Sequence, residues 1–395
     1  MKKLIYSSLF PTIILSITFA CQGQTPKALE NNRLFSEEKE RVLKKAEDYI
    51  GLEPITVTAS VSERSTGGIH DFYSEGDYWW PDPENPDGPY IRKDGMTNPD
   101  NFTAHREAMI RLSQISGALG SAYLVTGDEK YAKALLPHLQ AWFTDKETLM
   151  NPNLLYGQAI MGRVTGRGIG IIDTIHLMEV AKAISAIENS EIASQAELIN
   201  QLKDWFATYL NWIFTHEYGI AERDNGNNHS VCWALQASVF ANLVGNQEVI
   251  DYCRKMYKTV LLPDQMADNG SFPLELERTK PYGYSLFNLD AMTGLCQELS
   301  DDDENLFIFT TENGKSIGKG LAFLYPYVKD KNSWPYQKDV MYWEEWPVKH
   351  SAYLFGGLAL DREAYLELWK SLSADFDKPE VVRNMPIRYP MLWVD

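Results

Sequence analysis

The chain has 395 residues, of which 44% are hydrophobic, and a formal net charge of −17. This length can bury a sizeable core, in one large domain or two ordinary ones. The acidic balance excludes a protein that binds nucleic acid through its overall field. It does not exclude an acidic substrate, because clustered Arg and His side chains act locally, within a Debye length of about 10 Å.

The N-terminus has the pattern of a secretory signal peptide. Lys2 and Lys3 precede an apolar run that ends at Ala20, which gives the charged start, apolar stretch and small-residue end of such a signal. Polar residues interrupt the run, which disfavours a transmembrane anchor. Cys21 after Ala20 is typical of a bacterial lipoprotein, but Thr18 departs from the usual aliphatic residue, so cleavage without a lipid stays an alternative.

These features predict three segments. Residues 1–20 are a signal peptide, residues 21–33 a polar tether and residues 34–395 a single domain. We expect a protein exported across the inner membrane to the periplasm, with a lipid on Cys21 as its only membrane contact. The sequence leaves the oligomeric state open.

Helical periodicity recurs along the rest of the chain. Apolar positions predict helices at residues 36–50, 102–126, 170–187, 192–216, 229–243, 249–262, 285–299, 306–325 and 362–372, with a further one after Gly127-Asp128. No segment alternates as a strand would. Hairpins at a pitch of roughly 50 residues indicate a repeat. We expect an all-α fold, an (α/α) toroid or incomplete barrel of helical hairpins, with one central concave face.

Residues 51–100 are rich in Gly, Pro and Asp and indicate a long functional loop. The loop contains Asp-Tyr-Trp-Trp-Pro-Asp-Pro at residues 77–83. Sugar rings have apolar faces that stack on aromatic side chains, so Trp79 is a predicted sugar-binding residue. The alternative is that Trp79 or Trp80 closes the end of the helical barrel.

Residues 151–167 form a second polar stretch. Tyr156, Gln158, Arg163 and Arg167 lie there among glycines, which permit close backbone approach, while arginine offers planar donors to a carboxylate. We therefore predict that these four side chains bind the substrate. The alternative is a loop whose arginines pair with neighbouring acids.

Residues 224–230, Asp-Asn-Gly-Asn-Asn-His-Ser, open a predicted helix. Asn227 or Asn228 can cap that helix, since an Asx side chain accepts from the free amides of a first turn. The other interpretation is that Asn228 and His229 point into a cleft, where an amide donor and an imidazole hold a carboxylate.

Residues 272–285 are the fourth stretch. Arg278 and Lys280 supply charge, and Tyr282 and Tyr284 precede the next predicted helix. A tyrosine beside an arginine can act as a base, because the cation stabilises its phenolate. We predict Arg278 and Tyr284 as catalytic residues and Lys280 and Tyr282 as substrate-binding residues.

These residue types together favour β-elimination from a uronic-acid polysaccharide. The proton at C5 is barely acidic until the neighbouring carboxylate is neutralised, which Asn228, His229 and Arg278 can do. Tyr284 can then remove the proton and return one to the leaving oxygen. This chemistry needs no metal or other cofactor.

Asn-Asn-His-Ser at the start of a helix, Arg-Thr-Lys followed by Tyr, and the Trp-Trp-Pro stretch resemble the alginate lyase superfamily of polysaccharide lyases. The chain resembles polysaccharide lyase family 38 more than family 5, from about Gly76 to Pro347. The resemblance implies an (α/α) toroid and carries the roles of Asn, His, Arg and Tyr over to Asn228, His229, Arg278 and Tyr284. In family 5 the tyrosine lies seven residues after the arginine, where this chain has Ser285, so Tyr282 stays an alternative to Tyr284.

Two rival functions remain. A glycoside hydrolase needs two carboxylates, for which Asp173, Glu275 and Glu277 are available; a non-catalytic glycan-binding lipoprotein needs only aromatic surfaces. Among lyase substrates, polymannuronate suits one tyrosine as both base and acid, polyguluronate would call on His229 as the base, and glucuronan stays open. Cys232, Cys253 and Cys296 indicate buried free thiols, and no zinc-ligand spacing occurs.

Overall fold

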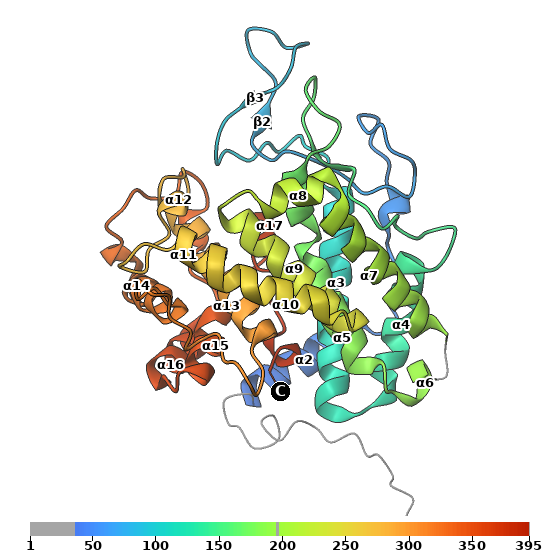
Figure 1. Ribbon diagram of the computed structural model, residues 1–395. Helices are drawn as coiled ribbons and strands as arrows, with labels where there is room; N and C mark the ends of the chain where they lie inside the picture. Colours follow the sequence, from blue (N-terminus) through green and yellow to red (C-terminus); the bar gives the residue numbers. More distant parts are fainter. Residues whose placement is uncertain (1–35, 195–196, 395) are drawn as a thin grey trace, which may run out of the picture.

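The computed structural model describes residues 36–194 and 197–394 (Figure 1). The predicted signal peptide at residues 1–20 and the tether with Cys21 lie outside these residues. Over the described ranges, no helix is both long enough and apolar enough to span a bilayer.

Within the described residues, an inner layer consists of α3 (Ala104–Thr126), α5 (Leu177–Ile187), α9 (Asn228–Val244), α13 (Pro281–Leu299) and α15 (Ser351–Ala359). Each packs on the next, in that order. α9 and α13 are buried along almost their whole length, as expected for helices that are apolar on all sides. The inner layer is therefore an arc of neighbouring helices.

The outer layer consists of α2 (Ser36–Tyr49), α4 (Glu129–Phe143), α7 (Leu198–Thr215), α10 (Gln247–Met256), α14 (Ile317–Lys329) and α16 (Glu363–Ser371). These helices are amphipathic: α7, for example, buries Leu202, Trp205, Phe206, Tyr209 and Ile213 toward the inner layer. The predicted all-α fold, an (α/α) toroid of helical hairpins, is confirmed. One hydrophobic core runs from Val42 to Trp393.

The C-terminal segment lies across the inner arc. α17 (Pro379–Arg383) is followed by an extended stretch and the 3₁₀ turn η7 (Pro390–Leu392), which packs on α3 and α5. Arg41 of α2 donates to the carbonyl of Arg388 over 2.7 Å. The segment thereby contacts α2, α3 and α5.

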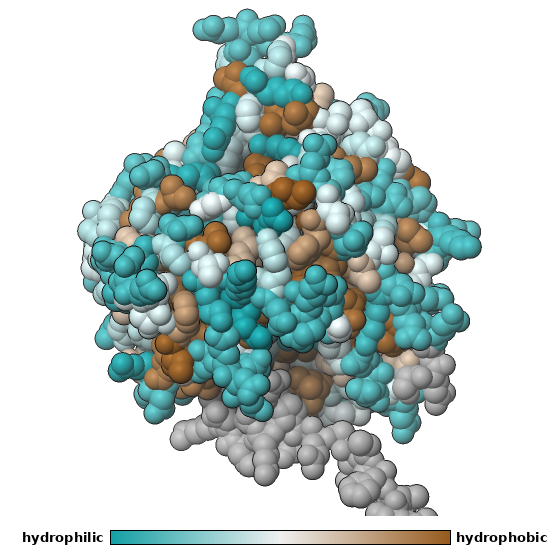
Figure 2. Space-filling view, in the orientation of Figure 1, coloured by the Kyte–Doolittle hydropathy of each residue, from teal (hydrophilic) through white to brown (hydrophobic). Residues whose placement is uncertain are grey.

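In the part of the chain that the structure describes, four short strands lie in the connecting loops, where the sequence predicted none. β1 (Tyr73–Glu75) pairs in parallel with β4 (Tyr156–Ala159), and β2 (Trp79–Trp80) pairs antiparallel with β3 (Ile91–Arg92). Figure 1 shows β2 and β3 standing above the helices. The same projection stands out in Figure 2, on a face that is mostly hydrophilic. The remaining short helices are α6 (Glu191–Ser194), α8 (Glu217–Arg223), α11 (Leu262–Gln265) and α12 (Pro273–Leu276).

Several predicted helix boundaries are wrong. The helix expected at residues 306–325 begins at Ile317, because Gly314 forms a turn with φ of 74°. The helix expected at residues 170–187 begins as the 3₁₀ helix η3 (Gly168–His176), and the one expected at residues 249–262 passes into the π-helical turn η4 (Tyr257–Leu261). α15 was not predicted, because it is apolar on every side and shows no helical period.

α13 begins at Pro281, four residues earlier than expected, because proline suits the first turn of a helix. Tyr284 therefore lies in this first turn. The three cysteines Cys232, Cys253 and Cys296 are buried and free, as predicted.

Candidate active site

A cavity of about 290 Å³ opens at the end of the arc where α9 and α13 begin. Its walls come from the loop around β2, from β4 and η3, from the α8–α9 turn, from the start of α13 and from α17. The start of a helix carries partial positive charge. Four arginines but only two aspartates line the cavity, so it is a basic site in a chain whose net charge is −17.

Asn228 is the first residue of α9, and Glu275 of α12 holds it in place. Its backbone N–H donates to Glu275 Oε1 over 2.9 Å and its Nδ2 donates to Oε2 over 2.8 Å. Burial raises the pKa of Glu275, while its hydrogen bonds from Asn228 lower it. Asn227, not Asn228, caps the helix, since its side chain accepts from the His229 N–H over 3.0 Å. Asn228 is thus free of the capping role and lines the cavity.

His229 follows on the same turn and is oriented by Glu222 of α8. Its Nδ1 lies 2.7 Å from Glu222 Oε1, and the Glu222 side chain is fully buried. Burial is the main cause that raises the pKa of Glu222, partly offset by His229. Because Nδ1 is engaged, Nε2 is the ring nitrogen that remains for a ligand in the cavity.

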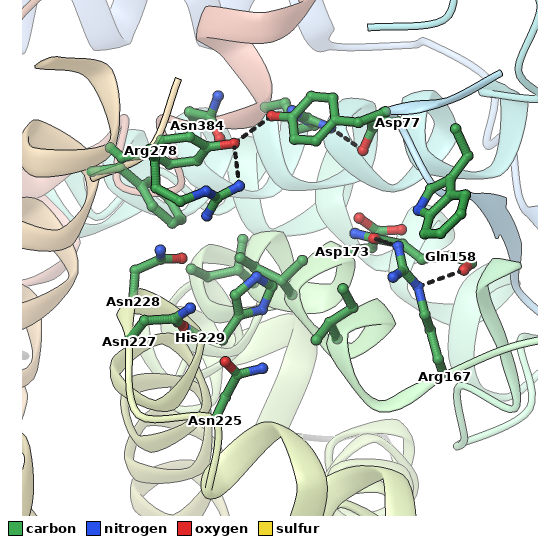
Figure 3. A pocket seen from close by; sticks show the side chains of 18 of the residues that line it. Asp77, Gln158, Arg167, Asp173, Asn225, Asn227, Asn228, His229, Arg278 and Asn384 are labelled. Atoms are coloured by element: carbon green, nitrogen blue, oxygen red, sulfur yellow. Dashed lines mark hydrogen bonds and ion pairs between the residues drawn. The ribbon is translucent and has the colours of Figure 1, made fainter. Parts of the chain in front are cut away.

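Arg278 and Tyr284 form the facing wall. Arg278 Nη2 donates to Tyr284 Oη over 3.2 Å, and its guanidinium lies 4.3 Å from the centroid of the Tyr284 ring. Asp94 fixes the guanidinium through a 3.0 Å contact with Nη2. Figure 3 shows Arg278 across the open space from Asn228 and His229. The structure therefore brings the four predicted catalytic residues to one cavity.

Tyr78, in the loop before β2, completes this wall. Its hydroxyl lies 2.7 Å from the Tyr284 hydroxyl. Burial and the neighbouring Tyr78 raise the pKa of Tyr284 well above its usual value, against the lowering effect of Arg278. Tyr284 is therefore a neutral phenol at neutral pH in the free protein.

Trp79, Gln158 and Arg167 line the other side of the cavity. Arg167 donates from Nε to the Gln158 carbonyl over 2.9 Å and from Nη2 to Gln158 Oε1 over 3.0 Å. Burial, then the like charge of Arg92, lowers the pKa of Arg167 to about 10. A Cβ on Gly76 would lie 2.6 Å from Trp79 and 2.9 Å from Arg167, so glycine is needed there for the two to approach.

The two carboxylates in the lining are already paired. Asp77 pairs with Arg106 over 2.8 Å and also with Arg383. Burial alone would raise the pKa of Asp77, but Arg106 and Arg383 outweigh it and lower this pKa to about 2. Asp173 accepts from Ser74 Oγ over 2.5 Å and lies 3.7 Å from Arg106. Neither is positioned as a free acid or base.

Four predicted substrate-binding residues lie outside the cavity lining. The ring of Tyr156 packs against Gly67. Arg163 is exposed and lies on the Trp79 ring, 5.2 Å from its centroid. Tyr282 is a core residue whose hydroxyl donates to the Tyr327 carbonyl over 3.1 Å. Lys280 is buried and pairs with Glu380.

Sequence reasoning missed several lining residues. They come from loops and from the C-terminal segment, and they are Tyr78, Arg92, Asn225, Arg383 and Asn384. Tyr78 and Asn225 lie in the stretches at residues 77–83 and 224–230 that the sequence already marked, so a signal existed for them. No pattern near Arg383 or Asn384 pointed to the cavity.

The arrangement suits chemistry on a carboxylate-bearing substrate. One wall carries the amide of Asn228 and the imidazole of His229. The facing wall carries the guanidinium of Arg278 and the phenol of Tyr284, which can exchange a proton. Across the described ranges, no cluster of three or more His, Cys, Asp or Glu side chains has the arrangement of a metal site.

Comparison with known proteins identifies the family. The family model for alginate lyase matches residues 56–334. The crystal structure of an alginate lyase from Bacteroides ovatus is 30% identical, covers 92% of this chain and 94% of that chain, and superposes with a TM-score of 0.78. No curated protein matches the chain.

More distant structures share the fold. Alginate lyase A1-III from Sphingomonas species A1 is 15% identical, with 91% of this chain and 94% of that chain covered and a TM-score of 0.54. A variant of A1-III complexed with a tetrasaccharide matches with the same identity and coverage and a TM-score of 0.55. The model match and the Bacteroides ovatus relative together show that the chain belongs to the alginate lyase family, and it is a polysaccharide lyase.

Proposed function

We propose that the protein cleaves alginate, in its polymannuronate blocks, by β-elimination that leaves a 4,5-unsaturated uronide at the new end. One observation carries the proposal. The Arg278 guanidinium lies within hydrogen-bonding distance of the Tyr284 hydroxyl, at 3.2 Å, and faces Asn228 and His229 across a basic cavity (Figure 3). The names of the related enzymes, which are alginate lyases, support the choice of polymer.

The first task of the site is to neutralise the C5 carboxylate. Asn228 donates one N–H to Glu275, so its second N–H is available to a substrate oxygen. His229 offers Nε2, and Arg278 adds positive charge that Asp94 holds in place. Because these donors are fixed before the substrate binds, they favour the charge that develops in the transition state.

The second task is proton transfer. Tyr284 as phenolate removes the C5 proton, the C4–C5 double bond forms, and the bond from C4 to the glycosidic oxygen breaks. Tyr284 then returns its proton to the departing oxygen. The elimination needs no metal in this scheme, since the side chains themselves neutralise the carboxylate.

Stereochemistry favours mannuronate. Its C5 proton and its O4 leaving group lie on the same side of the sugar, so one residue can serve as both base and acid. In guluronate they lie on opposite sides, and His229, on the wall facing Tyr284, would be the base. Glucuronan is the other polymer to test, since it also carries a carboxylate at C5.

The rival hydrolase function is not favoured. Hydrolysis requires one carboxylic acid that donates a proton and a second free carboxylate. Asp77 and Asp173 are both ion-paired, Glu275 is occupied by Asn228, and Glu277 is exposed outside the cavity lining.

The direct test is incubation with polymannuronate, polyguluronate and glucuronan while ultraviolet absorbance is followed. An unsaturated uronide absorbs, whereas a hydrolysis product does not. We expect the fastest rise with polymannuronate. Reducing ends without absorbance would indicate a hydrolase, and binding without either product would indicate a glycan-binding lipoprotein.

We also propose that the enzyme acts in the periplasm, after export directed by residues 1–20 and with attachment through a lipid on Cys21. The support is the sequence pattern around Ala20-Cys21. Metabolic labelling with a fatty acid, in the native chain and in Cys21→Ser, tests the attachment.

A further inference from the structure

Lys280 lies behind the wall formed by Tyr78, Arg278 and Tyr284 and is not part of the cavity lining. Its side chain is 5% exposed, and its ammonium pairs with Glu380 of α17. Burial alone would lower the pKa of Lys280, but Glu380 and Tyr78 together outweigh burial and raise this pKa, so the side chain stays charged. The ammonium is therefore buried in an ion pair outside the cavity lining.

The Lys280 ammonium faces both tyrosines of the hydroxyl pair. Nζ lies 4.9 Å from the centroid of the Tyr78 ring and 5.5 Å from that of Tyr284. The Lys280 carbonyl also accepts from the Tyr284 N–H over 3.0 Å, as the first bond of α13. Lys280 thus holds the backbone of Tyr284 and places a positive charge against both rings.

Glu380 sets how much of that charge the tyrosines experience. It is shared between Lys280 and Arg383, whose Nη2 lies 2.7 Å from Glu380 Oε2. The charge of Glu380 acts on Tyr284 in the opposite sense to that of a cation. Ionisable groups from several elements therefore face Tyr284. The loop before β2 supplies Tyr78, the segment that leads into α13 supplies Arg278 and Lys280, and α17 supplies Glu380 and Arg383. His229 lies across the cavity.

We propose that Lys280 is a positioning residue that stabilises the phenolate of the Tyr78–Tyr284 pair, that Glu380 moderates this effect, and that Lys280 does not bind the sugar. The inference rests on the proposed role of Tyr284 as base and acid. In the ionised form that takes the C5 proton, one negative charge is shared by the two hydroxyls, which lie 2.7 Å apart. A buried cation against both rings lowers the energy of that state wherever in the pair the charge resides.

The proposal makes two substitutions act in opposite directions. Lys280→Met removes the cation and should lower kcat about tenfold at pH 8, as a shift of one pKa unit implies, with KM unchanged. Glu380→Gln removes the opposing charge, while the glutamine oxygen can still accept from the Lys280 ammonium and Tyr78 still favours its charged form. This variant should raise kcat at the same pH. Lys280→Arg keeps the charge and should retain most of the wild-type rate.

A titration independent of activity accompanies the kinetics. Phenolate absorbance is measured against pH in each background and again with Tyr284→Phe added, and the difference reports the tyrosine pair. Its midpoint should move to higher pH with Lys280→Met and to lower pH with Glu380→Gln. If Lys280→Met does not fold, the isosteric Glu380→Gln variant carries the test alone.

The outcomes separate the two proposals. A raised KM with an unmoved titration in Lys280→Met would show a substrate contact and overturn the inference. If both variants lost activity while the midpoint of the phenolate titration stayed unchanged, the Lys280–Glu380 ion pair would have only a structural role. That result would also overturn the inference. Opposite titration shifts in a protein with no lyase activity would uphold the electrostatic role and reject the proposed function instead.

Discussion

His229 and Glu222 come from two different helices, α9 and α8, yet Nδ1 lies 2.7 Å from Oε1 of the fully buried glutamate. The turn between the helices brings the carboxylate behind the imidazole. The orientation of the proposed carboxylate-neutralising ring thus depends on a residue that lies outside the cavity lining. This relationship leads to the first prediction.

Glu222→Gln should lower kcat roughly tenfold to a hundredfold, as expected when the orienting partner of a functional histidine is lost. Burial raises the pKa of Glu222, so the carboxylate is lost on acidification at a higher pH than for an ordinary glutamate. The wild type should therefore lose activity in weak acid, and the variant should lack that limb of the pH profile.

Glu298→Gln is the matched control for Glu222→Gln. Glu298 is also buried and paired, with Lys182 at 3.0 Å, but it lies outside the cavity lining. We expect a loss of stability with the kinetic constants kept. Equal kinetic losses in both variants would contradict a specific role for Glu222.

Tyr284→Phe should lower kcat by about a hundredfold to ten-thousandfold, while the affinity for polymannuronate is kept. Tyr282→Phe, two residues earlier on the same helix turn, removes a hydroxyl that bonds only in the core. It should cost about 1 kcal/mol of unfolding free energy and leave kcat unchanged. A Tyr284→Phe variant with full lyase activity would contradict the assignment of Tyr284 as the base.

The rate should rise with pH from neutral into the alkaline range. The pKa of Tyr284 lies well above its usual value because of burial and Tyr78, and the deprotonated form is the base. The active fraction therefore grows as pH increases toward that pKa. Initial rates across the range, with circular dichroism to exclude unfolding, check this; a steady fall from pH 7 to pH 9 would contradict it.

Asn227→Ala should reduce both stability and activity, because the cap it removes precedes Asn228 and His229. Asp128→Ala removes an equivalent cap from α4, none of whose residues lines the cavity. Each should cost about 1 kcal/mol, read from denaturant unfolding, but the Asp128 variant should keep its lyase rate. Parallel losses of rate in both would place the effect in global stability.

Arg167→Lys should raise KM about tenfold with little change in kcat. Lysine cannot make the two directed bonds that Arg167 makes to Gln158 and cannot offer a planar donor to a carboxylate. Arg254→Lys, at a surface ion pair with Asp301, serves as the control and should leave both constants unchanged.

Local sequence patterns predicted part of the candidate site. A cap followed by an amide and an imidazole at a helix start is a local pattern, and it located Asn228 and His229 correctly at the cavity. The sequence did not determine whether Tyr282 or Tyr284 lies at the cavity. Residues two apart on a helix point to nearly opposite sides, and only packing shows which side meets the core.

Long-range contacts account for what the sequence could not show. Tyr78 reaches Tyr284 across 206 positions of chain, and Glu380 reaches Lys280 across 100. No periodic pattern around Tyr78 or Glu380 predicts these contacts. The same reason explains why α15 was missed: a helix buried on all sides has no polar face to reveal its period.

The cavity lining runs from Asp77 in the first loop to Asn384 near the C-terminus. Its residues meet only after the inner arc and the C-terminal segment across it have assembled, because no shorter stretch of the chain contains them all. Catalysis is therefore a property of the completed chain and not of any folding intermediate. A chain that ended before α17 would lack Arg383 and Asn384 of the lining and should be inert toward the polymer.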